Sequence, residues 1–493
     1  MLNAAAYLLE VGEHGRVAIE SDDASVTYGE LRDRVGRAAA AWRALGLGVG
    51  DRVLVLAPDS IGWVVAYLGA IWAGGVAVGL NSRLLERELS VIVGESGARF
   101  AWCSADSVEL FERCVEAAGG GPELVGEARF ARLLGEQAPV GAVEREADDP
   151  AFWIYTSGTT GLPKAAVHAQ RCVLAATDIA AGVLGAGRED RFYSSSKLFF
   201  AYAHANSLCA GLRSGATVIL DREWATPERV VETVARHRPS AAFIVPTLYL
   251  KLLQSGVARQ LRDVRLFVAA GEKLPGAIRS GWLEATGRSI LDGYGTSETN
   301  FLMLYDPDGS GVLRLAPRVE LSWREARWGE PGRIWIRHPS VALGYWERPE
   351  ASADSFGPGC FSPGDLFVDR GDERVEIRGR QDDLLKIAGQ WVSVVDVDAA
   401  LLAGCGEFVR ELGTVPVGRP EGLNMIAVFA VAKEGLGGQA AAALDAAIEA
   451  LPRQRRPRET HWVDALPRTP TGKLQRNKLI DLRTAASAML IDT

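Results

Sequence analysis

Short apolar runs alternate with helical patterns over residues 1–380 of this 493-residue chain, and this alternation constrains its fold more than any other feature. A short apolar run between turn residues is typical of a buried strand, and a longer amphipathic stretch is typical of a helix. Strands that alternate with helices indicate an α/β architecture. The strand candidates are Val53–Leu56, Arg99–Trp102, Thr217–Leu220, Ala242–Val245 and Leu266–Ala269, and the helical patterns between the last three are Pro227–Arg236 and Thr247–Ser255.

The pattern changes near Glu373, where a charged, turn-rich passage begins. Beyond it the sequence predicts a helix over Val394–Ala403, a strand over Met425–Ala432 and an Ala-rich helix over Gln439–Leu451. A chain of this length is expected to form more than one domain. We therefore predict an N-terminal α/β domain over residues 1–380 and a small α+β domain over residues 381–493, joined by a polar hinge.

Composition limits the class of protein. The net charge of −8 argues against a nucleic-acid-binding surface, which needs a basic excess. The 6 cysteines are scattered without a CxxC pair or nearby histidines, so we expect reduced structural thiols and a cytoplasmic protein. The first residues carry Glu10 and Glu13 and no basic cluster, which argues against a signal peptide.

One segment imitates a membrane span. Residues 60–80 carry no charge and are long enough to cross a bilayer. Gly74 and Gly75 interrupt the segment, however, and a strand-like run follows them. The sequence therefore predicts a buried helix, a turn and a buried strand here, and no span.

A loop that suits a polyphosphate follows the strand-like run that ends at Tyr155. The sequence YTSGTTGLPK, Tyr155 to Lys164, combines hydroxyl donors, glycines that expose the backbone, and a cation. It is not a Walker A loop, because Pro163 and Ala165 stand where that loop has Gly and Ser or Thr. An ordinary turn is the alternative. The candidate phosphate ligands are Thr156, Ser157, Gly158, Thr159, Thr160, Gly161 and Lys164.

Two further turns are predicted at the carboxyl ends of strands, where α/β sheets bind ligands. The first is Gly271-Glu272-Lys273-Leu274-Pro275, and the second is Leu291 to Glu298, LDGYGTSE. In the second turn an aromatic ring can stack on a base, hydroxyls can meet a phosphate, and Glu298 can bind Mg²⁺. A glycine-flanked turn with a packed tyrosine is the alternative for this fragment alone.

Three segments nearer the C-terminus also carry candidate residues. Asp365 lies in a predicted turn and suits a ribose, or else caps a local structure. Residues 379–389 gather Arg380, two aspartates and Lys386 where the domains should meet, although a solvated charge run is the alternative. Lys473 lies on a Gly-containing loop near the C-terminus.

In this order and spacing, the six segments resemble the acyl-adenylate-forming superfamily of acyl- and aryl-CoA synthetases, adenylation domains and beetle luciferases. The resemblance runs from about residue 25 to 480 and implies a large domain of packed sheets and helices with a small mobile C-terminal domain. It implies that Lys473, Glu298, Thr296 and Lys386 are catalytic, with Glu298 and Thr156 as metal ligands. It also implies nucleotide contacts from Gly271, Glu272, Lys273, Asp292, Gly293, Tyr294, Gly295, Asp365 and Arg380, beside the phosphate ligands above. Asp382 would be the hinge and Gly389 would line the thiol tunnel.

Within the superfamily, Lys197-Leu198-Phe199-Phe200-Ala201-Tyr202 followed by Asn206 is similar to the benzoate-CoA ligase group. This resemblance places Ala201, Tyr202, His204 and Phe301 in the substrate pocket. Two departures alter that pocket: His204 stands where the benzoate ligases have Leu, and Phe301 stands where they have His. His204 is then either a satisfied core histidine or the reader of a ring substituent.

The implied reaction is activation of an aromatic acid by ATP and Mg²⁺ through acyl-AMP, followed by transfer to coenzyme A. The acid is a small molecule, and neither nucleic acid nor membrane is an expected partner. A carrier protein in place of coenzyme A is the alternative acceptor, and the protein is expected to be a monomer or a homodimer.

Overall fold

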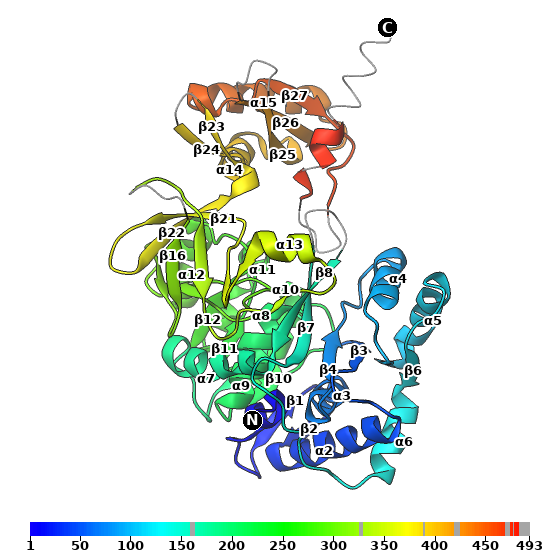
Figure 1. Cartoon of the computed structure of the whole chain (residues 1–493). Coiled ribbons are helices and arrows are strands. Elements are labelled where there is room, and N and C mark those ends of the chain that lie inside the picture. The colour runs from blue at the N-terminus through cyan, green and yellow to red at the C-terminus, as the bar shows by residue number, and fades with distance from the viewer. Residues whose placement is uncertain are drawn as a thin grey trace. The chain divides into compact units, whose positions relative to one another are not determined.

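The computed structural model describes residues 1–157, 163–324, 329–387, 390–418, 424–468, 474–476 and 478–482. The chain divides into two compact units (Figure 1). The first unit comprises Met1–Ser322, Trp335–Pro363 and Arg370–Val375, and the second comprises Trp323–Ile334, Gly364–Asp369 and Glu376–Thr493. Each unit has its own hydrophobic core.

The larger sheet of the first unit has the order β2-β1-β10-β9-β11-β12-β13-β14-β15, and β15 pairs in turn with Arg374 and Val375 of the same unit. Its six central strands, from β1 to β13, run parallel, whereas β2, β14 and β15 pair antiparallel at its two sides. The carboxyl ends of β12 and β13 therefore open at the same edge. The strands are β1 (Val17–Glu20), β2 (Ser25–Thr27), β9 (Arg191–Ser194), β10 (Thr217–Ile219), β11 (Ala241–Phe243), β12 (Leu266–Ala269), β13 (Ile290–Tyr294), β14 (Leu304–Asp306) and β15 (Leu313–Leu315).

A second sheet has the order β18-β8-β7-β4-β3-β5-β6. Strands β7, β4, β3, β5 and β6 are parallel, and β8 folds back antiparallel on β7 before β18 pairs antiparallel with β8. The strands are β3 (Arg52–Leu56), β4 (Val76–Gly79), β5 (Phe100–Cys103), β6 (Glu123–Gly126), β7 (Pro150–Ser157), β8 (Pro163–Ala169) and β18 (Gly344–Tyr345).

Helices α2 (Tyr28–Ala44) and α3 (Ile61–Trp72) pack closely beside this second sheet. A Cβ atom added at Gly69 would lie 2.5 Å from the Ala38 Cβ, so the two helices meet at small residues. The Trp42 Nε1 also donates to the Ala66 carbonyl at 3.1 Å. Because α3 is followed by the turn at Gly74 and by buried β4, the predicted helix, turn and strand over residues 60–80 are confirmed.

The larger sheet is covered by α10 (Pro227–His237), α11 (Pro246–Gln254) and α12 (Gly276–Thr286), which share one apolar core with it. The remaining elements of the first unit are α1 (Ala4–Leu9), α4 (Glu86–Glu95), α5 (Val108–Ala117), α6 (Glu127–Glu136), α7 (Ala175–Asp178), α8 (Ala201–Ala203), α9 (Ala210–Arg213), α13 (Pro349–Ser355), two π-helical turns (Ile179–Val183 and His204–Cys209), and the sheet β16 (Glu320–Trp323), β17 (Ile334–Arg337), β20 (Cys360–Phe361) and β19 (Phe356–Gly357).

The second unit is built on a small mixed sheet, β25-β26-β27, with β25 antiparallel and β27 parallel to β26. Its elements are β21 (Asp365–Asp369), β22 (Arg374–Arg380), β23 (Leu384–Ile387), β24 (Gln390–Ser393), α14 (Val394–Cys405), β25 (Val409–Gly418), β26 (Asn424–Ala432), α15 (Gly437–Ala450) and β27 (Glu459–Trp462). The two helices and the strand predicted for this part of the chain are confirmed to within two residues.

The predicted α/β class with a smaller C-terminal α+β part is therefore correct. In the part of the chain that the structure describes, every helix is too short or too polar to cross a membrane.

Candidate active site

The ends of the predicted phosphate loop lie on a β-hairpin. Strand β7 leads into the loop and β8 leaves it, with Thr156 directly opposite Lys164 in the antiparallel register. The Lys164 Nζ lies 4.6 Å from the centre of the Tyr345 ring, which comes from β18. The loop's central candidates, Gly158, Thr159, Thr160 and Gly161, lie outside the described residues, as does the side chain of Ser157.

The same Tyr345 joins the loop to the acidic residue of the second predicted turn. Its hydroxyl donates to Glu298 Oε1 at 2.7 Å, and the Glu298 side chain is buried. Tyr345 lies here because β18 pairs with β8, which puts Tyr345 opposite Ala166. The tertiary structure thus brings Thr156, Lys164 and Glu298 to one place, with Tyr345 between the cation and the carboxylate.

Hydrogen bonds within the turn fix the position of Glu298. The Thr296 Oγ1 accepts the backbone N–H of Glu298 at 3.2 Å and that of Thr299 at 3.3 Å. The Ala342 N–H donates to the Glu298 carbonyl at 2.9 Å. Glycine is required just before the turn, because a Cβ at Gly295 would lie 2.5 Å from the Phe301 carbonyl oxygen.

One detail of the sequence prediction for this segment is wrong. Residues 291–294 are not part of a turn but belong to β13, where Asp292, Gly293 and Tyr294 pair with β14. The turn begins at Gly295. Tyr294, half-buried at the end of the strand, remains the aromatic residue next to the turn.

A buried histidine contacts the backbone of the turn that carries Glu298. His168 on β8 donates through Nε2 to the Ser297 carbonyl at 2.8 Å, and its ring stacks on Phe152 with 4.9 Å between the centroids. Burial lowers the pKa of His168 to about 4, so the ring is neutral at pH 7. The neutral ring holds the main chain of the turn without adding charge.

The first predicted turn is real, but two of its nearby acids have protein partners. Gly271 adopts φ of 85° directly after β12, as a glycine in a tight turn can. Glu272 accepts the Thr247 hydroxyl at 2.6 Å. Asp292 accepts from Arg279 at 3.3 Å, and burial raises its pKa to about 7 in spite of that cation.

The predicted substrate-pocket residues come from two segments. Ala201 and Tyr202 are half-buried at the start of α8, and the Tyr202 hydroxyl donates to the Val268 carbonyl at 2.8 Å. Phe301 is fully buried after the Glu298 turn. His204 links the two segments, because its Nδ1 lies 3.3 Å from the Asn300 Oδ1.

Both ring nitrogens of His204 are occupied, since Nε2 lies 3.2 Å from the Tyr67 hydroxyl. Burial lowers the pKa of His204 to about 3. A neutral imidazole carries one N–H and one acceptor, so these two partners satisfy it completely. Of the two interpretations left open by the sequence, the geometry supports the satisfied core histidine.

The remaining candidates belong to the second unit. The Arg380 guanidinium packs against Gly364, where an added Cβ would lie 2.8 Å from its Nη2, and Asp365 is the next residue. Lys386 lies 5.6 Å from the Trp391 ring across the β23–β24 hairpin. The side chain of Asp382 and all of Gly389 and Lys473 lie outside the described residues.

A resident metal site is not built into the described residues, which contain no cluster of three or more His, Cys, Asp or Glu side chains. A single carboxylate is nevertheless what Mg²⁺ uses when substrate phosphates and water supply its other ligands. The Tyr345 hydroxyl takes Oε1 of Glu298, and no described residue donates a hydrogen bond to Oε2.

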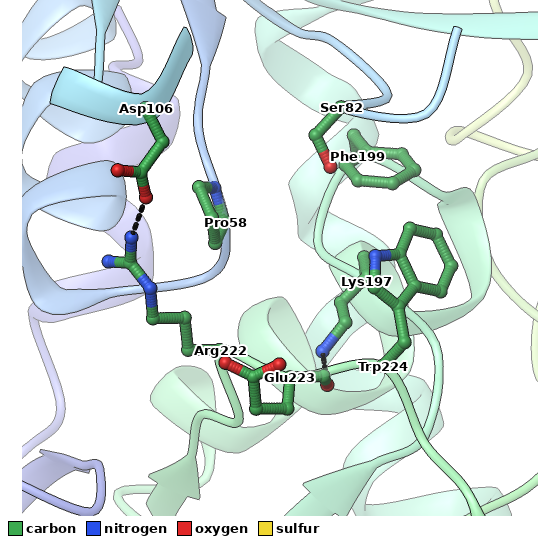
Figure 2. Close-up of a pocket in the computed structure, with 8 residues that line it drawn as sticks. All are labelled: Pro58, Ser82, Asp106, Lys197, Phe199, Arg222, Glu223 and Trp224. Atoms are coloured by element: carbon green, nitrogen blue, oxygen red, sulfur yellow. Dashed lines mark hydrogen bonds and ion pairs between the residues drawn. The ribbon is translucent and has the colours of Figure 1, made fainter.

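A separate cavity of about 190 Å³ lies beside the segment that leads into Ala201 (Figure 2). Pro58, Asp106 and Arg222 form one side of it, and Ser82, Phe199, Lys197 and Trp224 form the other. The Lys197 ammonium donates to the carbonyls of Asp221 and Glu223, and Arg222 pairs with Asp106. Because both cations have protein partners, we assign this cavity no ligand.

Comparisons with known proteins identify the family of this chain. The model of the AMP-binding enzyme family matches residues 10–346. The 3-hydroxybenzoate–CoA ligase of Aromatoleum sp. (strain CIB) is 38% identical, over 95% of this chain and 94% of that protein. The benzoate–CoA ligase of Thauera aromatica is 34% identical, over 96% and 92%. The crystal structure of a benzoate CoA ligase from Burkholderia xenovorans LB400 has a TM-score of 0.83 and 33% identity, over 97% of this chain and 100% of that chain.

These comparisons define an adenylate-forming enzyme, and the chain belongs to the AMP-binding enzyme family. Within that family it is an acid–thiol ligase of the aryl-CoA type. The resemblance drawn from the six sequence segments is thus confirmed.

Three residues of the site escaped the sequence analysis. His168 had a detectable signal, because it lies two and four residues from Ala166 and Lys164 on one face of a strand. Tyr345 and Asn300 had none, since only the β18–β8 pairing and the fold of the Glu298 turn bring them to the site.

Proposed function

We propose that this enzyme activates a small benzoate-class acid with ATP and transfers the acyl group to coenzyme A. The supporting observation is the arrangement of Lys164 and Glu298 on either side of Tyr345, at the end of the hairpin that carries the phosphate loop. A cation and an acid held in one place suit a nucleoside triphosphate with its divalent ion. The choice of the acid and of the thiol follows the named activities of the relatives, which are 3-hydroxybenzoate–CoA ligase and benzoate–CoA ligase.

In the first step an oxygen of the aryl carboxylate bonds to the α-phosphorus of ATP. The bond from that phosphorus to its bridging oxygen breaks, and pyrophosphate leaves with the electron pair. This chemistry needs positioning and charge neutralisation rather than a protein nucleophile. Lys164, Thr156 and the glycine-rich loop hold the β- and γ-phosphates, and Thr296 contacts the α-phosphate.

Glu298 is the residue that would hold Mg²⁺, with Thr156 as a second ligand. The ion would neutralise charge on the phosphate oxygens. Glu298 fits this role because its Oε1 is fixed by Tyr345 while Oε2 faces no donor among the described residues. Thr296 and Ala342 hold the backbone on each side of the carboxylate.

The second unit supplies the remaining groups of our proposal. Asp365 and Arg380 bind the ribose, and this is supported by the packing of the Arg380 guanidinium against Gly364, the residue before Asp365. Lys473 stabilises the charge that develops in the first step, and Lys386 is a further catalytic cation. The C-terminal domain, residues 381–493, then turns about Asp382 relative to residues 1–380.

In the second step the sulfur of the thiol attacks the acyl carbon of the mixed anhydride. The bond from that carbon to the AMP oxygen breaks, so AMP leaves with the electron pair, the thiol proton is released and a thioester forms. The Gly389 loop guides the thiol. Coenzyme A is the acceptor in this proposal, and a carrier-protein phosphopantetheine is the alternative.

The test is AMP release by the full chain with benzoate, 3-hydroxybenzoate, 4-hydroxybenzoate, anthranilate and octanoate, each with and without coenzyme A. We expect coenzyme A-dependent turnover with the aromatic acids and little with octanoate. Turnover of octanoate alone would overturn the assignment of the acid. Acyl-AMP that forms but accumulates in the presence of coenzyme A, and is discharged by a phosphopantetheinylated carrier protein, would overturn the assignment of the thiol.

A further inference from the structure

Asn300, in the interior of the first unit, has one amide atom without a hydrogen-bond partner in the described part of the chain. Its side chain is only 2% exposed, and its Nδ2 has no hydrogen-bond partner among the described residues. A buried donor left unpaired costs free energy, so such a group in a native protein calls for an explanation. A ligand that accepts its hydrogen bond would remove that cost.

The backbone conformation of Asn300 shapes the turn that carries Glu298. Asn300 adopts φ of 60°, in the left-handed region that asparagine enters more readily than most residues other than glycine. Its N–H donates to the Thr296 carbonyl at 2.9 Å, which closes the turn that carries Glu298.

The amide of Asn300 is oriented by a chain of hydrogen bonds. The Asn300 Oδ1 accepts from His204 Nδ1 at 3.3 Å, and His204 Nε2 in turn accepts the Tyr67 hydroxyl at 3.2 Å. The Tyr67 ring is fixed by stacking on Trp63, with 4.5 Å between centroids. With Oδ1 turned toward the histidine, Nδ2 is directed away from it, because the two amide atoms diverge from one carbon.

Asn300 stands between the two segments that carry the proposed acid pocket. It directly precedes Phe301, and its partner His204 lies three residues after Ala201, a spacing that puts both on one face of a helical turn. The turn at His204 widens into a π-helix, His204–Cys209, which is a feature frequent at functional sites. The hydrogen bond from His204 to Asn300 therefore links the two segments that carry the proposed pocket residues.

We infer that Asn300 reads a hydroxyl substituent on the ring of the aromatic acid, and that His204 and Tyr67 are positioning residues for its amide. This inference rests on the proposed function and deepens it, because it names hydroxybenzoates as the substrate class. A phenolic hydroxyl can accept from Nδ2. Benzoate offers nothing at this position, and an aromatic amine is a poor acceptor. The neutral state of His204, whose pKa burial lowers to about 3, keeps the whole chain of groups uncharged.

The test compares kcat/KM for 3-hydroxybenzoate, 4-hydroxybenzoate and benzoate in the full-length enzyme, by coenzyme A-dependent AMP release. A site that hydrogen-bonds a substrate hydroxyl discriminates strongly against the analogue that lacks it. In Asn300→Ala we expect the ratio of kcat/KM for the favoured hydroxybenzoate to kcat/KM for benzoate to fall by at least about tenfold. His204→Leu, which leaves Asn300 in place but unoriented, should lower the preference by a smaller factor.

Asn206→Ala is the matched control, because Asn206 is also buried and its Oδ1 has no partner among the described residues. We expect this variant to keep the preference. The inference fails if Asn300→Ala keeps the preference, if it lowers all three substrates equally, or if Asn206→Ala removes the preference instead. If the wild-type enzyme turns over benzoate and the hydroxybenzoates equally, the inference is wrong but the proposed function still holds. If the enzyme turns over no aromatic acid, both are wrong.

Discussion

The Tyr345 hydroxyl donates a hydrogen bond to Glu298 Oε1 at 2.7 Å, although the two residues lie 47 positions apart in the chain. The same tyrosine ring lies beneath the Lys164 ammonium at 4.6 Å. One side chain thus sets the spacing between the carboxylate and the cation, and an aromatic face near a cation adds a modest attraction of its own. The first prediction follows from this arrangement.

We expect Glu298→Gln to lower the rate of ATP–pyrophosphate exchange by about 100-fold or more, since it removes charge stabilisation at the reacting phosphates. Tyr345→Phe keeps the ring beneath Lys164 but loses the hydrogen bond, so a smaller loss of about tenfold is expected. Tyr28→Phe is the control, because the Tyr28 hydroxyl donates to the Ala216 carbonyl at 2.7 Å away from these groups. Equal losses in Tyr345→Phe and Tyr28→Phe would show that the tyrosine has only a structural role.

Lys473→Ala separates the two half-reactions. Exchange of pyrophosphate into ATP should be abolished, because the lysine neutralises charge only in the adenylation step. Conversion of supplied benzoyl-AMP to the coenzyme A thioester should continue at close to the wild-type rate. Lys478→Ala, an exposed lysine five residues away, should alter neither step. Intact exchange in Lys473→Ala would remove Lys473 from the mechanism.

Arg476 is predicted to hold the second unit together near its C-terminus. It contacts Asp398 at 2.6 Å, Asp383 at 3.1 Å and the Thr414 carbonyl at 3.3 Å, and burial raises the pKa of Asp398 to about 6 in spite of this cation. Arg476→Met leaves Asp398 buried without its counter-charge, so we expect a loss of about 2 kcal/mol in unfolding free energy at pH 8.

Chemical denaturation, followed by hydrogen exchange in the second unit, measures that loss. The double change Arg476→Met with Asp398→Asn should recover much of it, since the more buried of the two carboxylates then carries no charge. Arg410→Met provides the control, because Arg410 is exposed and lies 3.8 Å from Glu411. Similar losses in both arginine variants would show that the contacts with Asp398 contribute nothing special.

The free energy of unfolding should also depend on pH through the buried His204. Burial lowers the pKa of His204 to about 3, below the value of about 6.5 that an unfolded chain has. The stabilisation from the neutral ring is therefore complete above pH 6.5 and is lost as pH falls toward 3. Between pH 6 and 4.5, the unfolding free energy of the wild type should fall, relative to that of His204→Leu, by about 1.4 kcal/mol per pH unit.

Urea unfolding of the two proteins across that pH range gives this difference directly. The exposed His14→Leu variant should follow the wild type throughout. If the curves for His204→Leu and the wild type run parallel with pH, the His204 ring is not kept neutral by burial.

The local pattern of apolar residues predicted most of the strands that could be checked. Apolar runs located β3, β10, β11 and β12 to within about two residues, because a buried strand in a parallel sheet must be apolar on both faces. The same reasoning missed that residues 291–294 belong to β13. Their Asp and Gly residues look like a turn, but pairing with β12 and β14 overrides that local preference.

The sequence by itself determined the α/β class, the glycine-rich phosphate loop and the acids and lysines of an adenylating enzyme, because each depends on a short run of residues. The tertiary structure decided which of those residues meet. Tyr345 reaches Glu298 through the β18–β8 pairing, and His204 finds Tyr67 and Asn300 on two distant segments. Hydrogen-bond partners far apart in the chain leave no periodic trace in it. Only the tertiary structure therefore shows that His204 is satisfied, and that the Asn300 Nδ2 lacks a partner among the described residues.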